Sequence, residues 1–319
     1  MNHPPDTRNP LAVPMLLLIC AIWAGAFVAL EAGPRGLNAA YGPGAGFAPA
    51  ALFLFLRFTL ATLLMPLLMP GALRAMDRRN IVAGAVLGLF FSAHLLTQLL
   101  GLGSESMDPS TSAFLTALFV VFAPLFGFAF RGRRPRLGVV LGIVPAVAGV
   151  AFIQGPPKGN LSAEAWLTLA AAALYGGQIV VTDVVTRSGK PPAQTFAMIA
   201  TCALVCGAAF AVSPGALGML AEPAVHAALA DWRLWAAEGY LALVSTVVAL
   251  ALLNRWQKEV SANQAAIIFT TTPVFVTLLA LAFGQAELSG WLAFGAGMIL
   301  CANLLAQLVG RAPARESKP

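Results

Sequence analysis

The stretch ALFLFLRFTLATLL, residues 51–64, is an apolar run that one arginine, Arg57, interrupts. Apolar residue types make up 59% of the 319 residues and charged types only 10%, roughly the reverse of the balance that covers the surface of a soluble domain. A helix needs about 20 mostly apolar residues to span roughly 30 Å of hydrocarbon in a bilayer. The composition and the run around Arg57 therefore predict a membrane protein.

Apolar runs of this kind recur along the whole chain. There are ten, at residues 11–30, 47–70, 81–102, 111–130, 137–154, 165–186, 194–213, 235–254, 262–283 and 289–309. They are too long for strands and lack the strict alternation of a membrane barrel, so helices are the spanning structure that satisfies their backbone in lipid. The sequence predicts an all-α integral membrane protein with ten transmembrane helices.

Positive charge is distributed unevenly between the two sides of these helices. Outside the runs, the amino-terminal segment, the even-numbered loops and the carboxyl-terminal tail hold 15 Lys and Arg residues, whereas the odd-numbered loops hold 3. Cytoplasmic loops of membrane proteins carry an excess of Lys and Arg, so both termini are predicted to be cytoplasmic. We interpret the basic clusters as topology determinants next to membrane lipids, and we expect no nucleic-acid partner for the net charge of +6.

Residue patterns that would support an enzyme are missing from the sequence. It has no His-Glu-x-x-His zinc motif, no Walker glycine loop and no Gly-x-Ser-x-Gly elbow. The four cysteines fall within apolar runs and are interpreted as small packing residues. We therefore expect no enzymatic activity, no cofactor and no bound metal.

The ten runs divide into two halves, residues 11–154 and 165–309. Residues 112–124, SAFLTALFVVFAP, share a pattern with residues 261–273, SANQAAIIFTTTP: a small or polar start leads into an apolar helix with one proline. Because five crossings are an odd number, the second half would enter the membrane from the opposite face. This predicts a 5+5 inverted repeat, a fold that places a binding site near the bilayer midplane and alternates its access.

Arg57 lies inside the second predicted helix, about ten residues from its outer end. A buried charge costs at least about 2.5 kcal/mol on insertion scales, so its side chain should face a cavity or a partner. Two uses fit. Arg57 binds an anionic group of a solute, or it makes a structural bond to helix carbonyls or to Glu31 or Glu238; we favour the structural use.

Other polar and aromatic residues lie at middle or outer-middle depth in helices of both halves. Trp23 is in the first run, His94 and Gln98 share one face of the third, and Tyr175 and Gln178 share one face of the sixth. Aromatic rings with a few hydrogen-bonding groups suit a small, partly apolar solute. We predict that these five residues line a midplane cavity.

Asp183 is a further candidate, for coupling transport to protons. A carboxyl within a membrane helix is a common proton relay. The alternative is a helix-end acid that pairs with Arg187, four residues later on the same face, and we favour this structural interpretation.

Several short motifs resemble one known family. IWAGAFVAL at residues 22–30 is similar to its Trp-Gly-Ser-x-Phe segment, Leu56-Arg57-Phe58 resembles its Leu-Arg-Phe, and residues 113–124 and 261–275 resemble its fourth and ninth helices. On this basis the chain resembles the EamA family of the drug/metabolite transporter superfamily. The resemblance implies a ten-helix inverted repeat that moves small metabolites across the bacterial cytoplasmic membrane, often outward and often with protons.

Together these inferences predict a secondary transporter, an exporter of small organic metabolites such as amino acids or related compounds. Its predicted binding residues are Trp23, Arg57, His94, Gln98, Tyr175 and Gln178. Two other classes stay open at this point: an integral-membrane enzyme that acts on lipids, and a membrane partner that transports nothing. The sequence leaves the coupling ion and the oligomeric state undetermined.

Overall fold

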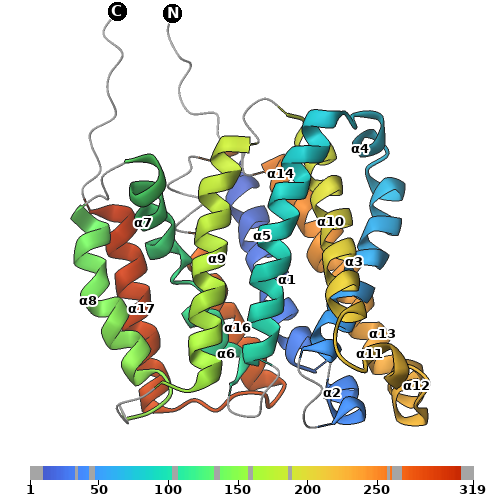
Figure 1. The fold of residues 1–319 in the computed structure, drawn as a ribbon. Coiled ribbons are helices and arrows are strands. Elements are labelled where there is room, and N and C mark those ends of the chain that lie inside the picture. Colours follow the sequence, from blue (N-terminus) through green and yellow to red (C-terminus); the bar gives the residue numbers. More distant parts are fainter. Residues whose placement is uncertain are drawn as a thin grey trace, which may run out of the picture.

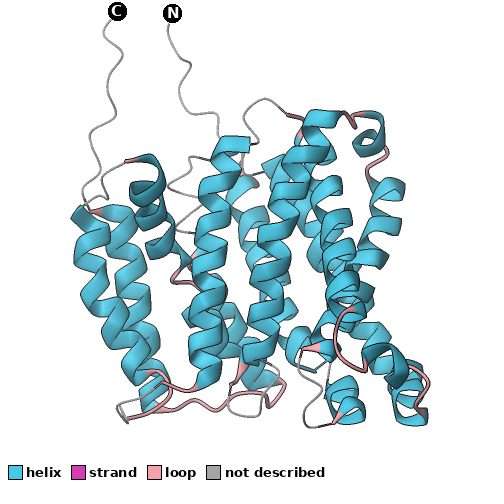
Figure 2. Ribbon diagram, in the orientation of Figure 1, coloured by secondary structure: helices cyan, strands magenta, loops and turns pink. Residues whose placement is uncertain are grey.

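A computed structural model describes most of the chain. It covers residues 10–32, 35–42, 47–102, 107–132, 137–156, 161–185, 189–256, 259–260 and 268–309. All the regular elements in these ranges are helices, and the longer ones run alongside one another as a bundle (Figure 2).

Helices of the first half are named here with their bounds. They are α1 (Ala12–Ala32), α2 (Arg35–Tyr41), α3 (Ala48–Leu68), α4 (Gly71–Arg74), α5 (Arg78–Leu102), α6 (Pro109–Thr116), α7 (Phe119–Arg131) and α8 (Leu137–Phe152). The second half contributes α9 (Ala163–Val185), α10 (Pro191–Ala211), α11 (Ala216–Met219), α12 (Pro223–Ala230), α13 (Trp232–Gly239), η1 (Tyr240–Val248), α14 (Ala249–Trp256), α16 (Thr272–Ala282) and α17 (Gly290–Leu308).

Length and composition make this a multi-pass membrane protein. Among the described residues, 8 helical segments are long and apolar enough to cross a bilayer, two of which join consecutive elements: Pro109–Phe130 and Trp232–Leu253. Two further apolar helices, α8 and α16, are shorter. The all-α membrane class predicted from the apolar runs is confirmed.

Two of the predicted continuous helices are interrupted. The run at 111–130 is split into α6 and α7 at Ala117 and Leu118. In the run at 235–254, residues 240–248 form a π-helix, η1, in which the Thr246 hydroxyl donates a hydrogen bond to the Leu241 carbonyl at 2.7 Å. Short π segments inside helices are frequent at functional sites.

Local sequence accounts for where several helices begin and end. Asp108 caps α6 by accepting a hydrogen bond from the Thr111 amide at 3.0 Å, and Pro109 follows it. Ser289 caps α17 in the same way, through the Leu292 amide. Gly132 ends α7 with a φ of 63°, a left-handed conformation that glycine adopts at low cost.

Glycines lie in the most extensive helix contact, between α8 and α17, which lie side by side in Figure 1. A Cβ on Gly138 would strike the Leu305 carbonyl, and one on Gly142 would lie 2.8 Å from the Ala302 carbonyl oxygen. The start of α8 thus packs on the end of α17, so the two helices are antiparallel. Small residues let membrane helices approach this closely.

Further contacts join helices of the two halves elsewhere in the bundle. α5 packs on α9 and α10, α3 packs on α10, and α1 packs on α16. At one end of the bundle α2 contacts α12, while α4 lies at the opposite end (Figure 1). The segment 214–234 forms the short helices α11 and α12 and the start of α13.

Candidate functional site

Arg57 is buried in α3, with 5% of its surface exposed. Its Nε and Nη2 atoms donate hydrogen bonds to the hydroxyl oxygen of Thr246 in η1, at 3.3 and 3.1 Å. The centre of the guanidinium lies 5.3 Å from the centre of the Phe58 ring. The arginine therefore bonds a helix of the other half through a hydroxyl group, rather than through the carbonyl or carboxylate expected from the sequence.

Glu238, in α13, is a carboxyl group on a helix that packs against α3 and its arginine. Its side chain is 0% exposed, and neither carboxyl oxygen has a hydrogen-bond partner among the described residues. It interacts electrostatically with Arg57 without an ion pair at hydrogen-bonding distance. The side chain of Glu31, the other acid considered as a partner, lies outside the described residues.

Trp23 approaches the same helix from α1. Its indole Nε1 donates a hydrogen bond to the Ser245 carbonyl at 3.3 Å, and its ring lies 5.7 Å from that of Phe269. Ser245 and Thr246 are consecutive residues of η1. The π-helix thus contacts two of the predicted site residues, Trp23 and Arg57, at adjacent positions.

A second group forms between α5 and α9. The His94 Nδ1 atom lies 2.9 Å from the Ala171 carbonyl oxygen, so it carries a hydrogen and donates it. The His94 ring stacks on the Tyr175 ring, with centroids 4.9 Å apart and an interplanar angle of 24°. Phe119, the first residue of α7, meets Tyr175 edge to face at 4.8 Å.

The two predicted glutamines each follow a residue of this stack by about one helical turn: Gln98 follows His94, and Gln178 follows Tyr175. Gln98 is buried one turn after His94, and its Nε2 donates a hydrogen bond to the Thr116 hydroxyl at 3.1 Å, at the end of α6. Gln178 is 7% exposed, and its side-chain carbonyl oxygen has no hydrogen-bond partner in the described part of the chain. Both amides therefore belong to the interior of the bundle.

Aromatic contacts connect the two groups. The ring of Phe58, next to Arg57, meets Phe91 at 6.0 Å, and Phe91 stacks on His94 at 6.1 Å. The structure thus separates the six predicted residues into one group at η1 and another between α5 and α9. The solute-binding role of each of the six stays a prediction.

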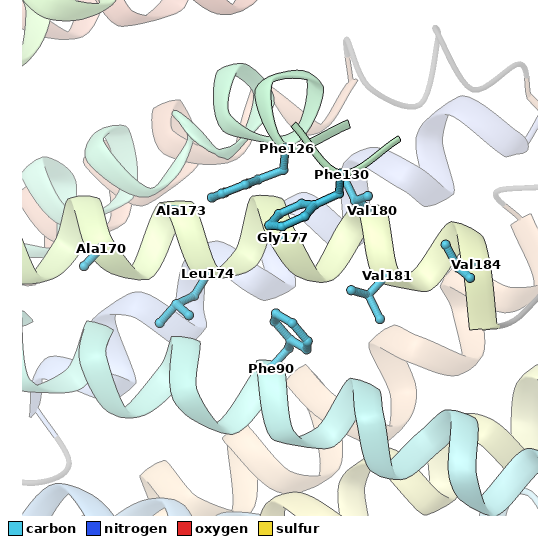
Figure 3. A pocket seen from close by; sticks show the side chains of 10 residues that line it. All are labelled: Phe90, Phe126, Phe130, Ala170, Ala173, Leu174, Gly177, Val180, Val181 and Val184. Carbon is cyan, nitrogen blue, oxygen red and sulfur yellow. The ribbon is translucent and has the colours of Figure 1, made fainter. Parts of the chain in front are cut away.

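A groove of about 530 Å³ runs along α9 between α5 and α7 (Figure 3). Its walls are apolar and include Phe90, Phe126, Phe130, Leu174 and Val181, and none of the six predicted residues lines it. The groove is therefore chemically different from the polar and aromatic groups described above.

Asp183 belongs to α9 and lies near its end, but only its backbone is described and its side chain is not. Its predicted coupling role is therefore not placed. Cys20, Cys202 and Cys206 are buried and free, whereas Cys301 is free and exposed on α17, which differs from the packing role expected for it. No cluster of three or more potential metal ligands occurs among the described residues.

Comparison with known families identifies the second half of the chain. Residues 162–307 match the model of the EamA-like transporter family. This half of the chain is thus similar to EamA-like transporters. The resemblance expected from the sequence motifs is thereby confirmed, and the EamA-like half contains Tyr175, Gln178, Glu238 and Thr246.

Comparison with solved structures extends the similarity of fold over most of the chain. One crystal structure of a protein shares 18% sequence identity with this chain and superposes with a TM-score of 0.56; the match covers 95% of this chain and 99% of the other. No curated protein matches the chain. At this identity the likeness concerns the fold alone.

Proposed function

We propose that this protein is a secondary transporter that moves small organic metabolites, such as amino acids or related compounds, outward across the cytoplasmic membrane by alternating access. The EamA-like second half and the multi-pass helical fold support a transporter of the drug/metabolite type. Export, the substrate class and the ten-helix inverted repeat with cytoplasmic termini are parts of this proposal.

The packing pattern of the helices is the observation that carries the proposal. Counting α6–α7 and α13–η1–α14 as single crossings gives five segments in each half, in the order α1, α3, α5, α6–α7, α8 and then α9, α10, α13–α14, α16, α17. We replace each segment by the one at the same position in the other half. The pair of α5 with α9 then becomes the pair of α13–α14 with α1, and the pair of α5 with α10 becomes the pair of η1 with α3. All four pairs pack in the structure.

Several other contacts obey the same exchange. The contact of α6 and α7 with α9 becomes the contact of α16 with α1, and both are present. The pairs of α3 with α10, α6 with α16, and α8 with α17 are unchanged by the exchange, and each of them packs. This pattern supports a two-fold relation between the halves. Because five crossings reverse the direction of entry, the relation supports an inverted repeat, in which one half rocks against the other around a central site.

The predicted site residues lie where rocking would change their contacts. The bonds of Trp23 with Ser245, Arg57 with Thr246 and His94 with Ala171 each join one half to the other. Irregular backbone at membrane depth is tolerated where protein or a cavity covers it, and η1 provides such a segment next to Arg57. A solute held between the halves would meet these groups.

Solute flux in proteoliposomes tests this function. Purified protein is reconstituted, and efflux of labelled amino acids and related metabolites is compared with efflux from protein-free vesicles, with and without a proton gradient. The proposal predicts protein-dependent movement of at least one solute class. If correctly folded protein moves none of them, a non-transporting membrane partner replaces the transporter.

A further inference from the structure

We infer that Glu238 is a solute-binding carboxyl group of this transporter, which holds the ammonium group of a zwitterionic solute and exchanges it for a proton. The inference rests on the proposed transport function and adds a residue and a chemical step to it. Glu238 is separate from the six residues that the sequence patterns single out.

Burial without a partner is the first observation. The Glu238 side chain is fully buried, and both of its oxygens lack a hydrogen-bond partner among the described residues. Buried polar groups in proteins almost always have such partners, and an exception calls for an explanation. An ionised carboxylate accepts hydrogen bonds at two oxygens, whereas a protonated one is neutral and is easier to bury.

The charged surroundings of Glu238 are sparse. α13 packs on α3, η1, α1 and α12. From α3 comes Arg57, which interacts with Glu238 electrostatically but directs Nε and Nη2 to Thr246. The Tyr240 hydroxyl, at the start of η1, donates to the Ile22 carbonyl, and His226 of α12 is exposed.

Two further elements complete these surroundings. Cys202 and Cys206 are buried thiols of α10, which packs on α3. The titratable side chain of α1 nearest its carboxyl end, Glu31, lies outside the described residues. Within the described residues, Arg57 is thus the one charged group that faces Glu238 from a neighbouring helix.

Opposite charges on two helices that pack together select the chemistry of the solute. A solute with only an ammonium group would be attracted by Glu238 and repelled by the Arg57 guanidinium. A solute with only a carboxylate would be attracted by Arg57 and repelled by Glu238. A zwitterion can place its ammonium group toward Glu238 and its carboxylate toward Arg57. Hydrogen bonds to charged groups contribute about 1.5–3 kcal/mol each, so losing one charge should weaken binding roughly tenfold or more.

Exchange with a proton follows from the need to compensate a buried carboxylate. When the ammonium group arrives, the O–H bond of the Glu238 carboxyl breaks, the proton passes to water on the open side, and the carboxylate oxygens accept N–H hydrogen bonds. After the solute leaves on the other side, Glu238 takes a proton from the water there. One proton and one solute then cross in opposite directions, as an exporter driven by an inward proton gradient requires.

The position of the pair allows this exchange. Arg57 belongs to the first half and Glu238 to the second, on helices α3 and α13 that pack together. Both side chains are buried, so the structure has the pair closed off from solvent. A movement that separates α3 from α13 would open both charges to the same side.

Proton release from the purified full-length protein tests the inference. Neutral L-amino acids are added one at a time to protein in weakly buffered detergent solution that contains a pH indicator, and binding affinity is measured in parallel. We expect about one proton per protein molecule to be released by the amino acid that binds. Isoamylamine lacks the carboxylate of leucine, and 4-methylpentanoate lacks its ammonium group, but both keep its side chain. If leucine is the amino acid that binds, we expect each of these two analogues to bind at least tenfold more weakly.

Variants separate Glu238 from other carboxyl groups. Glu238→Gln should abolish proton release and weaken amino-acid binding at least tenfold, whereas Glu287→Gln, at an exposed carboxyl group between α16 and α17, should leave both within twofold of wild type. Should Glu238→Gln fail to fold, Glu238→Asp keeps the carboxyl, and the amino-acid-induced loss of the protonated carboxyl band in the wild-type infrared difference spectrum should shift in that variant.

Each remaining result counts against the inference. Proton release that persists in Glu238→Gln, or that disappears in Glu287→Gln, assigns the exchange to another group. No release from wild-type protein that still transports amino acids overturns the inference and leaves the proposed function intact. If no solute moves in proteoliposomes at all, the proposed function fails as well.

Discussion

The hydrogen bonds between Arg57 and Thr246 predict a large effect from a small substitution. Thr246→Val replaces a hydroxyl by a methyl group of similar size, so it leaves no cavity. It removes the acceptor of the two guanidinium hydrogen bonds, at 3.3 and 3.1 Å, and the donor to the Leu241 carbonyl at 2.7 Å. Arg57 is only 5% exposed, so its guanidinium would then be buried without that partner.

The expected magnitude depends on the charge of Arg57. Hydrogen bonds between neutral side chains of membrane helices contribute about 0.6 kcal/mol on average, whereas bonds to charged groups contribute about 1.5–3 kcal/mol. Both guanidinium bonds end on one oxygen, so we count them once. We expect Thr246→Val to lower the free energy of unfolding by about 2 kcal/mol, a factor of roughly 30 in the unfolding equilibrium.

Denaturant titration in detergent, followed by tryptophan fluorescence, measures this change. Thr246→Ser keeps the hydroxyl and is the matched control, which should stay within about 0.5 kcal/mol of wild type. A Thr246→Val protein that is also within about 0.5 kcal/mol of wild type would show that the hydroxyl does not support Arg57, and the structural role of the η1 contact would be refuted.

Three further predictions concern the helix contacts and the aromatic group. Gly142→Val should lower the free energy of unfolding by about 1–3 kcal/mol because its side chain meets the Ala302 carbonyl, whereas Gly297→Ala on α17, which meets nothing within 4 Å, should be nearly neutral in the same titration. Gln98→Leu loses one neutral bond and should cost about 0.6 kcal/mol, while solute binding measured by calorimetry should fall far more if Gln98 contacts the solute. His94→Phe keeps a ring beside Tyr175 but loses the bond to Ala171; we expect folded protein by size-exclusion chromatography with weaker solute binding, and unchanged binding would exclude His94 from the site.

The sequence was sufficient to predict the helices because hydrocarbon imposes a length and a composition on each crossing. The run at 81–102, for example, corresponds to α5, which begins three residues earlier at Arg78. Polar residues can extend a helix beyond the hydrocarbon core, so hydropathy alone places this boundary too late. The same reasoning placed the start of α8 at residue 137, where the structure has it.

Interruptions within the helices could not be read from hydropathy. Ala117 and Leu118 are as apolar as their neighbours, yet α6 ends before them. The π-helix η1 likewise has an apolar sequence, and its register depends on side-chain bonds such as that of Thr246 with Leu241. These features depend on tertiary contacts that a single sequence does not reveal.

The candidate site was predicted in its residue types but not in its grouping. Residues one turn apart, such as His94 and Gln98, were expected together, and both are buried where α5 meets neighbouring helices. Helix periodicity gives the face of a residue but not which helix it meets. The sequence therefore offered Glu238 only as one possible partner of Arg57, and its burial without a hydrogen-bond partner appears only in three dimensions.

Alternating access is the central claim, and access to Gln178 from the two faces of the membrane tests it most directly. Gln178 belongs to α9 and is 7% exposed. A Gln178→Cys protein in sealed vesicles is treated with a membrane-impermeant maleimide on the outside only or the inside only. We predict labelling from each face separately, with a ratio that changes when transported solute or a proton gradient is present. Labelling from one face alone, unaffected by either, would contradict alternating access.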